Sequence, residues 1–182
     1  MVKIGINGFG RIGRLILRAL LENYKGKIQV VGINDLGSIE TNAHLIKYDS
    51  THGILNQDVK TTSDGFKIGD QNIKVFAEKD PSKLPWGKIG ADVVLECTGF
   101  FLDKASAGKH ISAGAKKVII SAPAKEVDFT LVQGVNSKEL KKDHNIISNG
   151  SCTTNCLAPV AMVLENNFGI EYGYMTTIHS YT

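Results

Sequence analysis

Residues 2–33 constrain the fold more than any other part of the chain, because they place a glycine-rich turn between a strand and a helix. The apolar run 2–7 ends at Gly8, and apolar residues then recur with helical spacing between Ile12 and Leu20. A second apolar run covers 28–33. Strand, helix and strand within about 33 residues form one βαβ unit, which favours an α/β fold with a parallel sheet.

The rest of the chain continues this alternation with one interruption. Three short runs, 59–61, 66–68 and 73–76, are separated by turn sequences and predict an antiparallel hairpin insertion. We expect further strands at 92–97, 117–121, 130–134 and 145–148, and helices at 41–47 and 102–113. The predicted class is therefore α/β, with a doubly wound parallel sheet.

The glycine-rich turn has the spacing G-x-G-x-x-G, carried by Gly8, Gly10 and Gly13. Gly8 allows the tight turn, Gly10 lets the backbone approach a pyrophosphate, and Gly13 lets the helix and strand pack closely. Asp35 ends the second strand about 20 residues further on, where a ribose hydroxyl acceptor is expected. A carboxylate there repels a 2′-phosphate, so a Rossmann-type domain that prefers NAD over NADP is predicted. The alternative, that the glycines serve only turns and the acidic residue is an ordinary surface group, is disfavoured by the complete unit.

A second candidate site begins at the turn 149–151, which leads into a helix expected at 152–167. Cys152 lies at the start of this helix, where the helix dipole stabilises a thiolate. One turn later, Cys156 has apolar neighbours and is expected to be buried. His179 ends a strand expected at 171–180; it is either an ordinary half-buried residue or, if it approaches Cys152, the base that activates a nucleophile. The C-x-x-x-C spacing lacks the two further ligands that zinc needs, so no metal site is expected.

Composition excludes several classes of protein. The 21 basic and 18 acidic residues give a net charge of +3, mixed along the chain and without the basic patch of a nucleic-acid binder. No apolar stretch approaches the roughly 18 residues of a membrane span, and the first residues do not resemble a signal peptide. Three cysteines without an export signal indicate reduced thiols and a cytoplasmic location.

We expect two parts in the chain. Residues 1–150 form the Rossmann domain, and residues 151–182 supply the first helix and strand of an α+β catalytic domain. A final strand with no neighbour to pair with would expose its edge. The sequence is therefore expected to be the first part of a longer polypeptide.

A nicotinamide site and an activated cysteine in one chain suggest oxidation of an aldehyde through a thioester. The hydroxyls of Ser151 and Thr153, beside the cysteine at a helix start, suit an anionic acceptor such as phosphate. The alternative is that they only cap the helix.

Several stretches together are typical of one enzyme family: 6–14, 34–36, 47–53, 84–86, 96–99, 121–123, 151–156 and 178–182. In this the sequence resembles the phosphorylating, NAD-dependent glyceraldehyde-3-phosphate dehydrogenases. The resemblance implies a cytosolic homotetramer of glycolysis and gluconeogenesis that acts on glyceraldehyde 3-phosphate and inorganic phosphate. Cys152 would be the nucleophile, and His179 would activate it and stabilise the oxyanion.

The resemblance also implies the binding residues. Arg11 and Ile12 would contact the pyrophosphate and Asp35 the adenosine ribose, while Lys79 and Thr98 would border the adenine side. The nicotinamide half would lie near Ser121. The phosphate sites would include Ser151, Thr153 and, for the substrate phosphate, Thr182.

Some features leave alternatives open. Position 79 is Lys where the family often has Arg, which replaces a planar guanidinium with a point charge. Erythrose-4-phosphate dehydrogenase has the same glycine and cysteine motifs and is the nearest alternative activity. A non-catalytic NAD-binding fragment is another, because family members continue well beyond the His179 strand. The 182-residue chain alone is accordingly expected to bind NAD without turnover.

Overall fold

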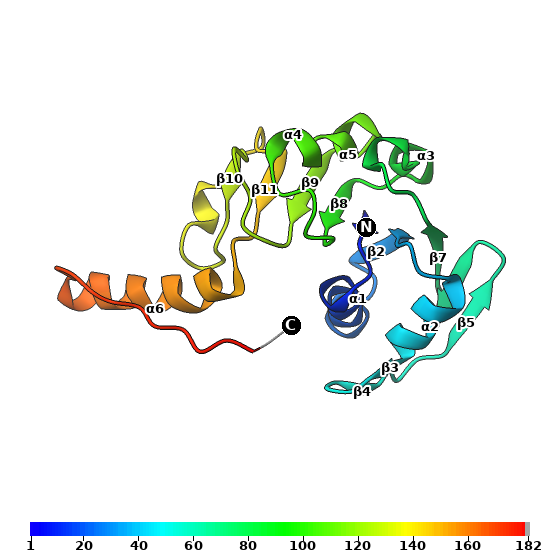
Figure 1. Ribbon diagram of the computed structural model, residues 1–182, viewed down its shortest axis with the longest axis horizontal. Coiled ribbons are helices and arrows are strands. Elements are labelled where there is room, and N and C mark those ends of the chain that lie inside the picture. The colour runs from blue at the N-terminus through cyan, green and yellow to red at the C-terminus, as the bar shows by residue number, and fades with distance from the viewer. Residues whose placement is uncertain (181–182) are drawn as a thin grey trace.

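A computed structural model describes residues 1–180, and within them the chain forms a nine-stranded sheet and a separate two-stranded ribbon (Figure 1). β1 (Val2–Asn7) lies inside the sheet and pairs in parallel with β2 (Ile28–Asn34) on one side and β8 (Val93–Glu96) on the other. Beyond β8 follow, also in parallel, β9 (Lys117–Ile120), β11 (Ile146–Ser148) and β10 (Phe129–Thr130).

Helices cover both faces of this sheet, as the doubly wound prediction requires. On one face, α1 (Arg11–Asn23) and α2 (Ile39–Lys47) bury Leu17 and Ile46 against the strands. On the other face lie α3 (Trp86–Ile89), α4 (Lys104–Ala107) and α5 (Lys109–Ser112), with their own two clusters of buried apolar side chains. The predicted Rossmann-type fold is confirmed.

The second face is built around the indole of Trp86, which is fully buried. A Cβ added at Gly5 in β1 would lie 2.5 Å from the indole, and one at Gly32 in β2 would lie 2.7 Å from Ile89. These strand glycines therefore leave the room that the aromatic ring and α3 occupy. Removing such a ring from a core costs about 3–5 kcal/mol.

The antiparallel insertion is present, and it extends the main sheet. β5 (Val59–Thr62), β6 (Gly65–Ile68) and β7 (Gln71–Phe76) pair antiparallel in sequence, and β7 then pairs in parallel with β2. The two-stranded ribbon of β3 (Tyr48–Asp49) and β4 (Gly53–Ile54) was not predicted. Two single-turn 3₁₀ helices complete the described elements, η1 (Pro81–Lys83) and η2 (Ser137–Glu139).

Two sequence predictions about boundaries differ from the structure. The helix expected at 102–113 is two short helices that meet at Gly108, where a Cβ would lie 2.9 Å from the Lys104 carbonyl oxygen. The strand expected at 130–134 is the two-residue β10, because its partner β11 ends at Ser148, opposite Thr130.

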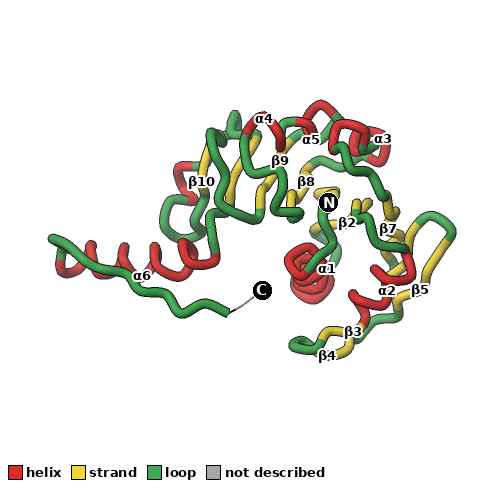
Figure 2. The backbone as a smooth tube through the Cα atoms, in the orientation of Figure 1, coloured by secondary structure: helices red, strands yellow, loops and turns green. Residues whose placement is uncertain are grey.

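The last described part of the chain is α6 (Cys152–Phe168), which projects away from the sheet in Figure 1. Residues 171–180 return beside α6 as an extended segment, seen in Figure 2 as loop, and not as the predicted strand. The strand prediction is wrong because a strand needs the backbone hydrogen bonds of a neighbour. None of the described strands lies beside this segment to supply them.

Candidate dinucleotide pocket and cysteine–histidine pair

A cavity of about 500 Å³ opens where β1, β2 and β8 end. The two neighbours of β1 in the sheet are β2 on one side and β8 on the other, so the strand order reverses at this point. Open α/β sheets bind ligands at this position, outside the carboxyl ends of the strands. The lining comprises Asn7, Gly8, Gly10, Asn34, Asp35, Leu36, Glu78, Lys79, Cys97, Thr98, Phe100 and Phe101.

The three motif glycines differ in what surrounds them. Gly8 has a φ of +90°, and a Cβ there would lie 2.7 Å from the backbone nitrogen of Thr98. At Gly13 a Cβ would lie 2.2 Å from the Gly8 carbonyl oxygen, so the helix could not approach the turn. Around Gly10, by contrast, none of the described protein atoms lies within 4 Å of such a Cβ. Two glycines thus allow close packing, and the third leaves open space on the pocket side.

The first turn of α1 offers backbone donors to this space. Its N-cap is Gly10, which has no side chain to accept a hydrogen bond from the first N–H groups. The side chains of the two residues that follow do not line the cavity: the Arg11 guanidinium pairs with Asp49, and Ile12 is half exposed. Any contact from Arg11 or Ile12 to a pyrophosphate would therefore come from the backbone.

Asp35 lies at the rim of the cavity with its carboxylate already oriented. One oxygen accepts a hydrogen bond from the Phe9 N–H and the other from the Gly37 N–H, each at 2.9 Å. Because each oxygen keeps a free lone pair, both can also accept from hydroxyl groups of a ligand. Lys79 and Thr98 line the same cavity.

Ser121 lies further along the sheet edge, at the end of β9, and does not line this cavity. Its side chain forms a hydrogen bond with the thiol of Cys97. Burial raises the pKa of that thiol to about 12, against a smaller opposing effect of the Ser121 hydrogen bond. Cys97 is therefore a neutral thiol at physiological pH.

Cys152 and His179 come together although 27 positions separate them in the chain. The thiol sulfur lies 3.0 Å from His179 Nε2, and His179 Nδ1 lies 2.8 Å from the Ser180 carbonyl oxygen. A carbonyl can only accept, so Nδ1 carries the proton and Nε2 faces the sulfur as a base. The hydrogen bond from His179 lowers the pKa of Cys152, and the same contact raises the pKa of His179. Both side chains are exposed.

The hydroxyls beside the cysteine have mixed surroundings. Ser151 is the N-cap of α6, and its Oγ accepts a hydrogen bond from the Thr154 N–H at 2.8 Å, which is the capping role considered from the sequence. Thr153 is half-buried in the first turn. The prediction for Thr182 lies outside the described residues. Cys156 is exposed, so its predicted burial is wrong: none of the described elements packs over that face of α6.

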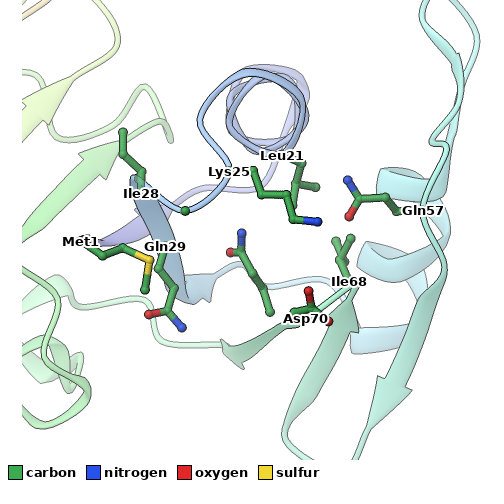
Figure 3. A pocket seen from close by; sticks show the side chains of 11 residues that line it. Met1, Leu21, Lys25, Ile28, Gln29, Gln57, Ile68 and Asp70 are labelled. Atoms are coloured by element: carbon green, nitrogen blue, oxygen red, sulfur yellow. The ribbon is translucent and has the colours of Figure 1, made fainter.

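A second cavity, of about 260 Å³, lies at the opposite ends of β1 and β2 (Figure 3). Met1 and Ile28 at the strand starts line it, together with Leu21 from α1 and Ile68 from β6. Lys25 and Asp70 also reach its wall. This cavity lies at the amino ends of the strands and lacks the glycine turn, so the pocket at the carboxyl ends is the better candidate for a dinucleotide.

Several residues that line the cavity at the ends of β1, β2 and β8 were not predicted as site residues. Asn34 and Glu78 directly precede the predicted residues Asp35 and Lys79. Phe100 and Phe101 follow the predicted residue Thr98 within three positions. Their positions at or just after the ends of β2, β7 and β8 are the signal that could have found them.

The sheet order, the glycine turn and the acidic residue after β2 define a Rossmann-type dinucleotide-binding domain, followed by a helix that carries a histidine-paired cysteine. Residues 2–104 match the family model described as glyceraldehyde 3-phosphate dehydrogenase, NAD binding domain, and residues 151–182 match the model of the C-terminal domain. The chain therefore belongs to the glyceraldehyde 3-phosphate dehydrogenase family. The match to its NAD-binding domain confirms NAD as the predicted cofactor.

Curated relatives match along the whole chain. It is 54% identical over 181 residues to glyceraldehyde-3-phosphate dehydrogenase of Xanthobacter flavus, and 54% identical over 182 residues to glyceraldehyde-3-phosphate dehydrogenase 1 of Bacillus subtilis strain 168. To the enzyme of Clostridium pasteurianum it is 55% identical over 182 residues. In each case the match covers 100% of this chain and 54% of the relative, so the chain spans about half the length of these proteins.

The structure also bears on membrane insertion. Across residues 1–180, none of the helices combines the length and the apolar character that crossing a membrane requires.

Proposed function

We propose that the protein containing this chain oxidises glyceraldehyde 3-phosphate to 1,3-bisphosphoglycerate, with NAD and inorganic phosphate. The observation that carries the proposal is the 3.0 Å approach of His179 Nε2 to the sulfur of Cys152. An exposed thiol whose pKa is lowered by a histidine is a nucleophile, and family membership supplies the aldehyde substrate.

The cavity at the ends of β1, β2 and β8 suits NAD, because open space beside Gly10 meets the N–H groups of the first turn of α1. Backbone groups of Arg11 and Ile12 hold the pyrophosphate, and Asp35 accepts hydrogen bonds from the adenosine ribose. The adenine side is bordered by Lys79 and Thr98, and the nicotinamide half reaches toward Ser121. When bound, NAD supplies the hydride acceptor for the oxidation.

The residues of this chain carry the covalent steps. The Cys152 thiolate attacks the aldehyde carbon, a C–S bond forms, and the carbonyl electron pair moves to oxygen, where the proton held at His179 Nε2 stabilises it. Loss of a hydride from this thiohemiacetal leaves a thioester. Phosphate oxygen then attacks the thioester carbon, the C–S bond breaks, and the thiolate is released with the acyl phosphate. Hydroxyls of Ser151 and Thr153 hold the inorganic phosphate, and Thr182 holds the phosphate of the substrate.

We further propose that the whole protein is a cytoplasmic homotetramer of glycolysis and gluconeogenesis, with a domain boundary near residue 150. The 182-residue chain by itself binds NAD without turnover. In support, the described residues bury no side chain of α6, so nothing encloses a substrate at Cys152.

The test is phosphate-dependent NADH formation by the whole protein and by two variants. Cys152→Ser should abolish the rate, and His179→Asn should lower it by about 10²–10⁴-fold, the usual contribution of a general acid–base group. A Cys152→Ser variant that retained the parent rate would overturn the proposal. Higher efficiency with erythrose 4-phosphate than with glyceraldehyde 3-phosphate would assign the alternative substrate.

A further inference from the structure

A row of buried polar side chains crosses three strands directly beneath the dinucleotide pocket. Asn34, Asn7 and Glu96 are the last residues of β2, β1 and β8, and they are paired in register. All three are at most 5% exposed. Asn34 Nδ2 donates to Asn7 Oδ1 at 2.7 Å, and Asn7 Nδ2 donates to Glu96 Oε2 at 2.6 Å.

The direction of these hydrogen bonds is set by backbone groups at one end of the row. The N–H of Glu78 donates to Asn34 Oδ1, and the carbonyl of Glu78 accepts from Asn34 Nδ2, both at 2.8 Å. The amide of Asn34 can therefore face Asn7 only with its nitrogen. Asn7 must in turn accept with its oxygen and donate to Glu96 with its nitrogen.

His110 sets the direction at the other end. The indole N–H of Trp86 can only donate, and it points to His110 Nδ1 at 2.9 Å. Nδ1 is therefore an acceptor, the ring is neutral, and its proton lies on Nε2, which is 2.9 Å from Glu96 Oε2. The buried pair is a hydrogen bond from a neutral imidazole to a carboxylate.

The second oxygen of Glu96 holds the opposite wall of the pocket. Oε1 accepts from the Thr98 N–H at 2.7 Å and from the Thr98 hydroxyl. That hydroxyl accepts in turn from the Phe100 N–H at 3.1 Å. Four donor groups thus converge on one carboxyl group, the Asn7 amide and His110 Nε2 at Oε2 and the Thr98 N–H and hydroxyl at Oε1.

The network ends on the pocket from both sides. Asn7, Asn34 and Glu78 line it on the side of β1 and β2, and Thr98 and Phe100 line it on the side of β8. Glu96 and His110 do not line it. Burying a carboxyl side chain costs free energy unless its oxygens are hydrogen-bonded. Its four hydrogen bonds offset that cost only when both walls keep their spacing.

We propose that Glu96 and His110 are positioning residues for NAD, which fix the spacing of the two pocket walls without touching the ligand. The proposal rests on the proposed binding of NAD in this cavity. The two walls carry Asp35, Lys79 and Thr98, which are the residues proposed to bind the adenosine half of NAD. Loss of Glu96 or His110 should therefore weaken binding of that half. Affinity for ADP-ribose, which lacks the nicotinamide, should therefore depend on the network as strongly as affinity for NAD does.

The first test is Glu96→Gln in the whole protein, with NAD and ADP-ribose titrated by calorimetry. The glutamine keeps the volume, but its NH₂ group faces donors on one side. Loss of a hydrogen bond that leaves buried polar groups unpaired predicts dissociation constants raised about tenfold or more for both ligands. With NAD saturating, kcat should stay within about twofold, since Cys152 is not involved. Binding of both ligands within twofold of the parent would overturn the proposal.

Controls separate positioning from general destabilisation. Val94→Ala removes buried methyl groups from the same strand, two residues away, and should lower the melting temperature while leaving NAD affinity unchanged. His110→Phe should weaken NAD binding, and His110→Gln, which can accept from the indole and donate to Glu96, should restore most of it. If all four variants lose affinity in proportion to stability, the network is only structural and the proposal fails.

If Glu96→Gln does not fold, the comparison of His110→Phe with His110→Gln tests the proposal in its place. Titration of the unsubstituted protein tests the proposed function separately. If that protein does not bind NAD, the proposed function is refuted; if it binds NAD and the variants bind equally well, only the positioning proposal is refuted.

Discussion

Alanine substitutions at two glycines of the same turn should separate stability from NAD binding. At Gly8 the φ of +90° is unfavourable for any side chain, and the added Cβ would lie 2.7 Å from the Thr98 nitrogen and 2.8 Å from the Cys97 carbonyl carbon. The strained backbone costs about 1–3 kcal/mol. Forcing a methyl group against rigid backbone adds about 1–3 kcal/mol. Gly8→Ala should therefore lower the free energy of unfolding by about 2–6 kcal/mol, a large share of a typical domain's stability.

Gly10→Ala is the matched control. Its backbone is extended, with φ −70° and ψ −159°, and the surroundings of the added Cβ are open. The change should alter stability by no more than about 1 kcal/mol. It should still weaken NAD binding, because the methyl group occupies the space through which the pyrophosphate approaches α1. Urea unfolding and calorimetric titration measure the two effects. Equal losses of stability at both positions would refute this reading of the turn.

Three further predictions follow from the same structure. Because His179 lowers the pKa of Cys152, His179→Asn should move the midpoint of the pH profile for iodoacetamide alkylation upward; an unchanged midpoint would contradict the pairing. Gly5→Ala should cost about 1–3 kcal/mol of unfolding free energy, since its Cβ would lie 2.5 Å from a buried indole, whereas no loss in urea unfolding would contradict that packing. The hydrogen bond from Lys104 lowers the pKa of Asp128 to about 2, so this carboxylate stabilises the fold above its ordinary pKa and loses that contribution as pH falls toward 2. Denaturation from pH 5 to 2 should accordingly show a smaller loss of stability for Asp128→Asn than for the parent.

The sequence predicted the parts of the fold whose signal is local. The βαβ unit was predicted because apolar spacing changes from strand to helix at Gly8 and back to strand at residue 28. The antiparallel hairpin insertion at 59–76 was predicted from its turn sequences. The ribbon at Tyr48–Asp49 and Gly53–Ile54 was missed because two-residue strands are too short to show any periodicity. The strand expected at 171–180 had a good pattern, but pairing depends on a neighbour that the described chain does not place there.

Within the candidate site, the same division holds. Gly8, Gly10 and Asp35 were predicted because their spacing along the chain reflects one local turn and the end of one strand. The row Asn34–Asn7–Glu96 was not, since Asn7 and Glu96 are 89 positions apart and their adjacency depends on strand order and register. From the sequence, His179 was expected to act as a base only if it approached Cys152. The distance between the two side chains depends on the folded chain.

The most direct test of the account is to trap the covalent intermediate. The whole protein is mixed with glyceraldehyde 3-phosphate and NAD without phosphate, quenched in acid and digested, and the peptides are identified by mass spectrometry. The account predicts a phosphoglyceryl thioester on Cys152 alone, formed with one equivalent of NADH and discharged when phosphate is added before the quench. An acyl group on Cys156 or Cys97, or NADH formation in a Cys152→Ser variant, would contradict it.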